Sequence, residues 1–335
     1  MRKRLLVAFS SLLALVLVGL MAIAWGFGPR LGIALTGRPF FLLPPSPERY
    51  AETILEVADH QAIHADSDEY LAARERALAV AKDASSTAEV HDALEAALEA
   101  AGGKHSGILN AAEREEWAQS DPAPSPGVTV LGAIAIATVP AFDGFASDGR
   151  LYAETLGRGL DSALSGPATC AVVDLRGNGG GDMGPMLAGV SPLLPDGTAL
   201  EFESAHGTTP VTITGSAVAG GGTPTSVDGV RKHLVPTAIL INAGTGSSGE
   251  ATAIAFKGVE GTRFFGRPTA GYASANIAFE MPDGALVMVT SANDKDRNSV
   301  VYGDNPLIPD EQTDDALEAA KAWLAAEHGC EEERR

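Results

Sequence analysis

A run of small residues over 244–250, Gly-Thr-Gly-Ser-Ser-Gly-Glu, contains a serine that could act as a nucleophile. It follows the stretch 238–241, which is short and wholly apolar, as buried strands are. We expect a helix to begin directly after the run. Ser247 would then lie at a helix N-terminus, where unpaired N–H groups and the helix dipole favour an alkoxide or an oxyanion. Taken alone, the run fits a serine N-cap beside flexible glycines better than it fits a nucleophile.

A second glycine-rich run, Asp-Leu-Arg-Gly-Asn-Gly-Gly-Gly over 174–181, continues a predicted buried strand at 171–175. Backbone N–H groups in so tight a turn could form an oxyanion hole, in which each donor stabilises the transition state by about 3–4 kcal/mol. The run lacks the GxGxxG spacing of dinucleotide-binding turns, and no Gly-Lys-Ser/Thr follows the glycines of the first run. Neither run therefore predicts a nucleotide site.

A third run, Gly-Gly-Lys-His-Ser-Gly over 102–107, places His105 between glycines at a predicted helix end. An imidazole positioned by backbone in this way could serve as the general base toward a serine. For any single histidine, a solvated or capping role is the more common one. The other histidines lie in polar or helical contexts that offer no such setting: His60, His64, His91, His206, His233 and His328.

The N-terminus predicts how the chain is delivered to its compartment. Basic residues over 1–4 precede an uncharged run over 5–28, which is long enough to span about 30 Å of hydrocarbon. The basic end would stay in the cytoplasm, so the remainder would be exported. We favour an uncleaved single-pass anchor, with the rest of the chain extracytoplasmic. A cleaved signal peptide, which would make the protein secreted, stays open because Ala-Ile-Ala at 22–24 weakly resembles a cleavage site.

The remaining sequence divides by its texture into a linker at 29–46, a helical region at 47–120 that carries His105, and a core at 125–328. Predicted strands alternate with helices in the core, which favours an α/β fold with a partly parallel sheet. The formal net charge of −19 argues against nucleic acid as a partner. The two cysteines, Cys170 and Cys330, lack metal-ligand spacing and could equally pair or remain thiols.

Together these runs resemble the C-terminal processing, or tail-specific, protease family over about residues 85–315. Residues 174–181 resemble the family's Asp-Leu-Arg-x-Asn-x-Gly-Gly turn, and 245–250 resemble its nucleophile motif, with the nucleophile at Ser247. Gly-Arg-Pro-Thr-Ala-Gly at 266–271 and the later segments 282–284, 296–297, 302 and 308–310 continue the pattern in order. The resemblance implies a crotonase-like (ClpP-like) ββα catalytic domain with a helical N-terminal cap.

The sequence departs from the better-known family members at their catalytic lysine, where it has Tyr272. Lys257 and Lys104 do not occupy the family's position. The histidine-serine element at 105–106 resembles that of the tricorn-core and retinoid-binding-protein-like branch, which implies a catalytic pair of Ser247 and His105. The glutamate that completes the relay in that branch has no equivalent here, so the third member stays open among Asp296, Asp304 and Ser106. The short segment between His105 and the glycine turn leaves no room for a PDZ domain.

We therefore expect an extracytoplasmic serine-type endopeptidase that acts on peptides or proteins and needs neither a metal nor an organic cofactor. Gly180, Gly179 and Ser248 are the predicted oxyanion donors. A catalytically inactive relative that binds peptides or apolar ligands is the alternative, and an acyl-CoA enzyme of crotonase type fits less well. The sequence does not predict an oligomeric state.

Overall fold

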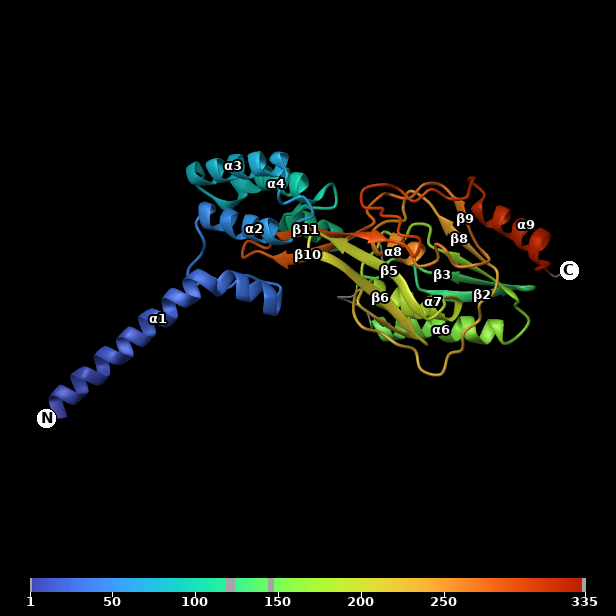
Figure 1. Ribbon diagram of the computed structural model, residues 1–335, viewed down its shortest axis with the longest axis horizontal. Helices are drawn as coiled ribbons and strands as arrows, with labels where there is room; N and C mark the ends of the chain where they lie inside the picture. The colour runs from blue at the N-terminus through green and yellow to red at the C-terminus, as the bar shows by residue number, and fades with distance from the viewer. Residues whose placement is uncertain (1, 119–123, 144–147, 333–335) are drawn as a thin grey trace. The chain divides into compact units, whose positions relative to one another are not determined.

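The computed structural model describes residues 2–118, 124–143 and 148–332. It divides into a helical unit, Met1–Ser120 with Asn276–Ser291, and an α/β unit, Asp121–Ala275 with Ala292–Arg335. Figure 1 labels many of the helices and strands of both units.

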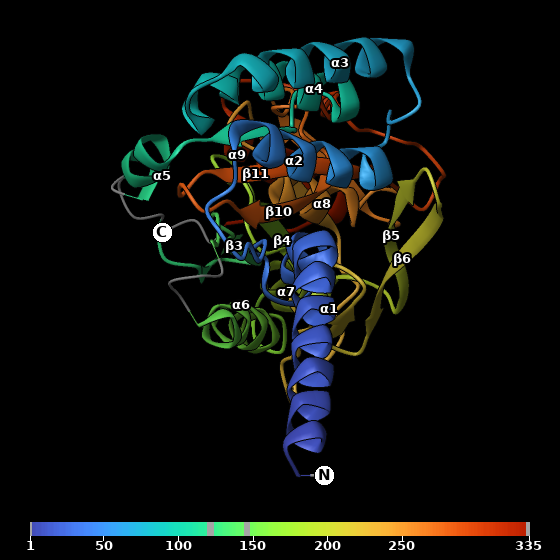
Figure 2. The same ribbon diagram turned by 90° about the vertical axis from the view of Figure 1, so that its left-hand side faces the viewer.

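The helical unit packs its helices on a strand hairpin. Its apolar core joins Tyr50 and Leu94 of the helices to Phe279 and Val287 of the hairpin, and Figure 2 shows α2, α3 and α4 over β10 and β11. The hairpin lies within 125–328, the range that the sequence predicts as the α/β core. Its apolar face nevertheless packs against the helices of the helical unit. The elements are α2 (Pro47–Gln61), α3 (Asp68–Asp83), η1 (Thr87–Val90), α4 (His91–Gly102), β1 (Gly107–Leu109), α5 (Ala111–Ala118), β10 (Ser274–Glu280) and β11 (Leu286–Lys295).

The N-terminal helix α1, Arg2–Thr36, extends into the range 29–46 that the sequence predicts as a linker. Pro29 lies inside this helix, and the ribbon bends along its length (Figure 1). Within the described part of the chain, Leu15–Thr36 is the one stretch long and apolar enough to cross a membrane, and a signal sequence would have the same properties.

The α/β unit is built on a sheet whose strands run in the order β12-β9-β8-β4-β3-β2. β2 is antiparallel to β3, and the other neighbours are parallel, so the predicted partly parallel sheet is confirmed. The strands are β2 (Gly127–Leu131), β3 (Ile134–Thr138), β4 (Cys170–Asp174), β8 (Thr237–Ile241), β9 (Thr262–Gly266) and β12 (Glu311–Gln312).

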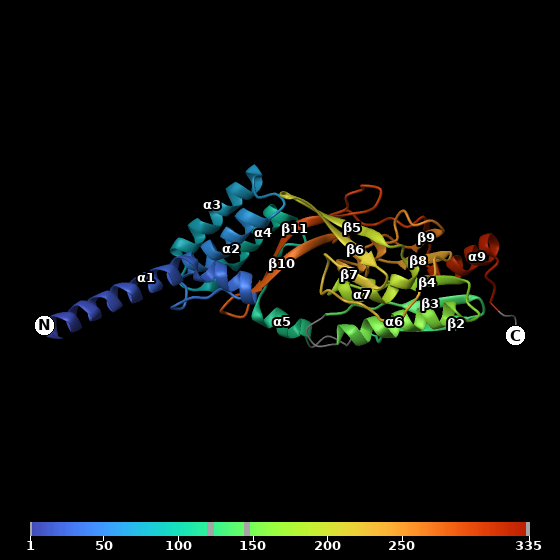
Figure 3. The same cartoon turned by 60° about the horizontal axis from the view of Figure 1, so that its bottom comes forward.

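Helices cover both faces of this sheet, because successive side chains of a strand point to opposite faces. Val173 and Ile239 face a core with the helices α6, α7 and α8, whereas Val172 and Leu240 face a core with α9. Figure 3 shows α6 beside β2 and β3. The helices are α6 (Gly149–Leu164), α7 (Met183–Val190), η2 (Ser191–Leu193), α8 (Ser248–Ile254) and α9 (Ala316–His328).

A smaller antiparallel layer completes the α/β unit. β5 pairs with β6, β6 pairs with β7, and the last residues of β11 pair with β5. These strands are β5 (Gly197–Ser204), β6 (Gly207–Thr214) and β7 (Ala217–Ala219).

A disulfide joins Cys170 at the start of β4 to Cys330 after α9, across a sequence separation of 160 residues. This resolves the alternative left open by the sequence, since the two cysteines pair. Cross-linking so long a loop removes much of the entropy of the unfolded chain.

Replacing Cys330 with Ser is expected to lower the free energy of unfolding by about 3–5 kcal/mol, because the unfolded chain regains that entropy. Denaturant unfolding of the full chain, with and without reductant, measures the loss. Reductant should destabilise the wild type to the same extent and leave the Cys330→Ser variant unchanged. Equal midpoints for the oxidised wild type and the variant would contradict the prediction.

Candidate active site

The two glycine-rich runs lie side by side because β4 and β8 are parallel neighbours that end at the same edge of the sheet. Thr245 Oγ1 donates to the carbonyl of Leu175 at 2.8 Å, and the N–H of Gly246 donates to the carbonyl of Asn178 at 2.9 Å. The Asn242 side chain accepts the N–H of Gly177 at 3.0 Å. These bonds hold the turn after β8 against the turn after β4.

Ser247 is the N-cap of α8 and has an unusual backbone conformation, with φ 49° and ψ −122°. Among the described residues, it shares a positive φ with only one other residue that is not glycine, Ser299. Such a conformation costs roughly 1–3 kcal/mol and persists only where its surroundings enforce it. A serine at a strained turn from a strand into a helix is also found in the nucleophile elbow of other hydrolases.

The side chain of Glu250 holds the backbone of Ser247 in this conformation. Its carboxylate is fully buried and accepts the N–H of Ser247 at 3.1 Å and the N–H of Tyr272 at 2.7 Å on one oxygen. The other oxygen accepts the N–H of Gly271 at 2.9 Å and the Thr269 hydroxyl. Burial raises the pKa of Glu250, and these bonds oppose that shift. One carboxylate thus joins the serine motif to the segment 269–272.

Sequence reasoning gave Glu250 no role, although a signal was present. A Ser followed three residues later by Glu at a helix start is the spacing of a capping box. The N–H of Ser247 bonded to the Glu250 side chain is one half of that arrangement.

Gly180 lies directly against Ser247. Its φ is +112°, and a Cβ at this position would lie 2.8 Å from the Cβ of Ser247 and 3.1 Å from the nitrogen of Ser248. No larger residue fits there. Its own N–H, predicted as an oxyanion donor, donates to the side-chain oxygen of Asn178 at 3.0 Å, because Asn178 closes this turn on itself.

Gly179 and Ser248 belong to the same cluster. Gly179 is exposed, and its carbonyl oxygen lies 3.7 Å from where a Cβ of Gly246 would be. The hydroxyl of Ser248 donates to the carbonyl of Gly181 at 2.5 Å. The α/β unit therefore brings together Ser247, Ser248, Gly179 and Gly180.

Asp296 and Asp304, two candidates for the third catalytic residue, belong to the α/β unit. The buried Asp296 carboxylate accepts the N–H groups of Asn298 and Val300 at 2.8 and 2.9 Å and the Tyr302 hydroxyl at 2.9 Å. It closes the turn over 296–302, and these bonds account for its burial. Asp304 is exposed in the loop that follows.

His105 and Ser106 belong to the helical unit, in the loop between α4 and β1. The Ser106 hydroxyl is buried, donates to Thr290 Oγ1 at 2.9 Å and accepts the N–H of Thr290 at 2.9 Å. Thr290 donates to the side chain of Asn276 at 2.8 Å, and Asn276 in turn donates to the carbonyl of His105 at 3.1 Å. Ser106 is thus part of a network that fixes the backbone of His105.

Lys257 does not replace the missing family lysine. It lies ten residues after Ser247, beyond the far end of α8, and its ammonium is 3.7 Å from the centre of the Phe264 ring. Burial lowers the pKa of Lys257, partly offset by Asp310 and Asp296. No group of His, Cys, Asp and Glu side chains that could hold a metal ion occurs in the described ranges.

Asp294 is a buried carboxyl that the sequence did not single out. It lies on β11 within the α/β unit, and its Oδ1 has no hydrogen-bond partner within the part of the chain that the structure describes. Burial, and secondly the charge of Glu250, raise the pKa of Asp294 to about 8. This shift favours the protonated side chain at neutral pH, and the charge of the carboxylate that binds the N–H of Ser247 contributes to it.

Both a family pattern and a named relative match this chain. The sequence pattern of Peptidase family S41 matches residues 134–312, more than half of the chain. The nisin-resistance protein of Lactococcus lactis subsp. lactis is 36% identical over 319 residues, which cover 93% of this chain and 98% of that protein.

Two solved structures extend this result. A lipoprotein from Streptococcus agalactiae has a TM-score of 0.70 at 29% identity, with 86% of this chain and 99% of that chain covered. The photosystem II D1 C-terminal processing protease has a TM-score of 0.56 at 14% identity, over 81% of this chain and 94% of that chain, and is similar in fold.

Replacing Asp294 with Asn is expected to flatten the pH dependence of stability between about pH 4 and 8. The folded protein keeps the Asp294 proton to about pH 8, whereas the unfolded chain releases it near pH 3.9. The unfolded state therefore binds fewer protons in this window, and this group's contribution to stability, complete below about pH 4, is lost as the pH rises.

Denaturant unfolding at a series of pH values measures the slope for each protein. Asp304→Asn is the matched control, since its carboxyl is exposed, and it should keep the slope of the wild type. Identical slopes for Asp294→Asn and the wild type would show that this carboxyl ionises normally.

Proposed function

Because this chain belongs to peptidase family S41, we propose that it is an extracytoplasmic serine-type endopeptidase with Ser247 as its nucleophile. The observation that carries the proposal is the strained backbone of Ser247 at the start of α8, held by a buried Glu250. A strain of roughly 1–3 kcal/mol that the surroundings maintain is typical of a functional position. A serine that served only as an N-cap would gain no stability from a strained backbone.

A crotonase-like core with a helical cap is the finer fold that we propose. The supporting features are the parallel strands β3, β4 and β8, with both glycine-rich turns at their carboxyl ends. The helices α2, α3 and α4 would be the cap, and His105 follows the last of them.

In the proposed mechanism, His105 removes the proton from the Ser247 hydroxyl, which attacks a peptide carbonyl to give a tetrahedral oxyanion. The N–H groups of Ser248 and Gly179 would stabilise that oxyanion. Gly180 contributes space, since its N–H is bonded to Asn178. His105 then protonates the leaving amine, and water releases the acyl group from Ser247.

For the group that orients His105, we propose fewer candidates than the three that the sequence left open. Asp296 already accepts three hydrogen bonds that close its own turn, and the Ser106 hydroxyl is bonded to Thr290. We therefore assign Ser106 a supporting role through the network with Thr290 and Asn276, and keep Asp304 as the acidic candidate.

The substrate class follows from where the chain would act and from its named relative. We propose that the anchor keeps the catalytic unit at the outer face of the cell membrane, where it meets peptides from outside. The relative in Lactococcus lactis is named for resistance to nisin. Nisin is therefore the first peptide to test as a substrate.

A fluorophosphonate probe is expected to label the wild type and Ser248→Ala but not Ser247→Ala, because only Ser247 would be activated as a nucleophile. Labelling of the purified full chain is read by intact-protein mass spectrometry, which also reports whether the N-terminal segment has been removed. Labelling retained in Ser247→Ala would place the nucleophile elsewhere. A wild type that never reacts would favour the peptide-binding alternative.

Replacing His105 with Gln is expected to slow cleavage of nisin by about 10²–10⁴-fold, the usual contribution of a general base. Product formation by the full chain is followed by mass spectrometry. His60→Gln is the control, since it removes an exposed histidine from α2 of the same unit. Cleavage at the wild-type rate by His105→Gln would exclude His105 as the base, whatever the labelling of Ser247.

A further inference from the structure

The C-terminal part of α1 is built into the helical unit rather than attached to it as a loose leader. The chain folds back after Gly37, so that a Cβ on Gly32 would lie 2.4 Å from the carbonyl oxygen of Arg38. A Cβ on Gly28 would likewise lie only 2.8 Å from the carbonyl oxygen of Phe40. Ile33 packs against the core of the unit. Residues 28–41 therefore form a fixed fold-back.

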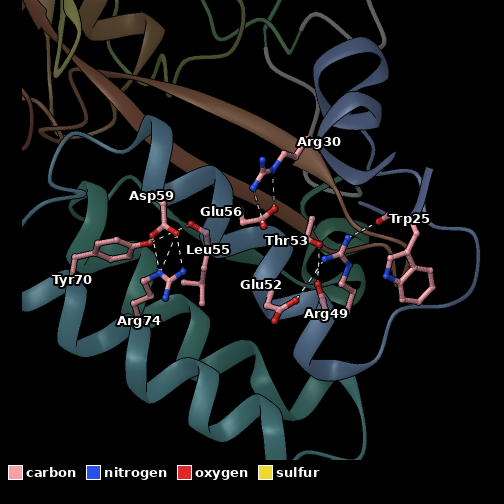
Figure 4. Close-up of polar contacts among 10 residues, drawn as sticks. All are labelled: Trp25, Arg30, Arg49, Glu52, Thr53, Leu55, Glu56, Asp59, Tyr70 and Arg74. Carbon is pink, nitrogen blue, oxygen red and sulfur yellow. Dashed lines mark hydrogen bonds and ion pairs between the residues drawn. The ribbon is translucent and has the colours of Figure 1, made fainter. Parts of the chain in front are cut away.

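Ion pairs fasten the same segment to the rest of the unit. Arg30 contacts Glu56 of α2 at 2.9 and 3.0 Å, and Arg38 contacts Glu280 of β10 at 2.9 Å. Figure 4 shows Arg30 directed at Glu56 and Arg49 directed at Trp25. Each arginine close to the fold-back thus has an acidic partner, since Arg49 also lies 3.7 Å from Glu52.

Pro29 marks the point at which α1 leaves its membrane-spanning part. Proline has no N–H, so the carbonyl of Trp25, four residues earlier, loses its helical partner. Arg49 of α2 donates to that carbonyl at 2.8 Å, and its guanidinium lies 6.0 Å from the centre of the Trp25 ring. A carbonyl bonded to an arginine of the folded unit belongs at the boundary of the hydrocarbon and not within it.

The length of the helix agrees with this boundary. Residues 5–24 are uncharged and number twenty, which at 1.5 Å per residue span about 30 Å, the thickness of the hydrocarbon core. A span over residues 5–24 would cross the membrane before Trp25, so the apolar residues that follow, which also belong to the apolar stretch Leu15–Thr36, would not be needed for spanning.

Large apolar side chains nevertheless remain exposed beyond the boundary. Phe27, Leu31 and Leu35 are spaced by four and so form one stripe of the helix, and all three are exposed. Gly28 and Gly32, which lie on the adjacent side of the helix, are turned to the fold-back. We call the following exposed residues the juxtamembrane patch: Phe27, Leu31, Leu35, Phe40, Leu42 and Leu43.

We propose that the juxtamembrane patch is a second membrane contact, which lies in the boundary between lipid headgroups and acyl chains and seats the helical unit on the bilayer. The occupant is a lipid surface because the patch is continuous with the spanning helix. Aromatic and aliphatic side chains beside a span are typical of this interface. The contact is apolar rather than electrostatic, since Arg30, Arg38 and Arg49 are paired with Glu56, Glu280 and Glu52. The inference rests on the membrane anchor of the proposed function.

The test uses the full chain with single cysteines for an environment-sensitive fluorophore, reconstituted in phosphatidylcholine vesicles. The native cysteines are joined in a disulfide and do not react. Leu43→Cys reports on the patch, with its side chain 65% exposed. Leu234→Cys, 63% exposed in the α/β unit, is the matched control, and Leu71→Cys on α3 is the control within the helical unit.

The label at position 43 is expected to emit at shorter wavelength than the controls and to lose intensity when quencher-bearing lipids are added. Adding phosphatidylglycerol should change neither effect, because the arginines are already paired. Emission at position 43 equal to that at 234 and 71 would overturn the proposal, as would quenching that appears only with anionic lipid.

A fourth label, Leu17→Cys in the span, separates this proposal from the anchor itself. Quenching at 17 without quenching at 43 keeps the anchor and overturns the second contact. Quenching at 43 in a chain shortened by cleavage supports the patch and overturns the anchor.

Discussion

The buried carboxylate of Glu250 is the interaction on which the candidate site depends. It accepts hydrogen bonds from Ser247, Thr269, Gly271 and Tyr272, which come from two separate segments of the chain. An ionised group away from water is costly unless such donors surround it. Because four donors converge on it, the turn that carries Ser247 and the segment that replaces the family lysine with Tyr272 are fixed relative to each other. Loss of this one side chain would leave both segments without their shared partner.

The strained backbone of Ser247 and the glycine turn after β4 belong to the same arrangement. Ser247 keeps its positive φ since Glu250 holds its N–H, and Gly180 can approach its Cβ because it has no side chain of its own. The parallel pairing of β4 and β8 brings the two turns to one edge of the sheet. The position of Ser247 therefore depends on backbone geometry more than on the number of polar side chains around it.

Much of this arrangement could be predicted from the sequence, because it follows local rules. Short apolar runs indicate β4 and β8, and the glycines after them indicate the turns. The sequence alone therefore predicts the residues that cluster around Ser247. What lay beyond prediction depends on burial. The pKa of Asp294 is raised because tertiary packing removes water, and the partner of Gly180 is set by the rotamer of Asn178. The sequence predicts the range 29–46 as a linker, but α1 continues to Thr36, and an arginine from α2 supplies the partner that the Trp25 carbonyl loses to Pro29.

The disulfide has a consequence for the order of events in the life of the chain. Cys170 begins the strand that ends in the glycine turn beside Ser247, and Cys330 lies 160 residues later, after α9. The bridge can therefore close only after α9 has been synthesised and the polypeptide has reached an oxidising compartment. The strand under this turn thus receives its covalent support only after the strands and helices between the two cysteines have been made. A molecule that stays in the reducing cytoplasm would have the same sequence but a less stable core.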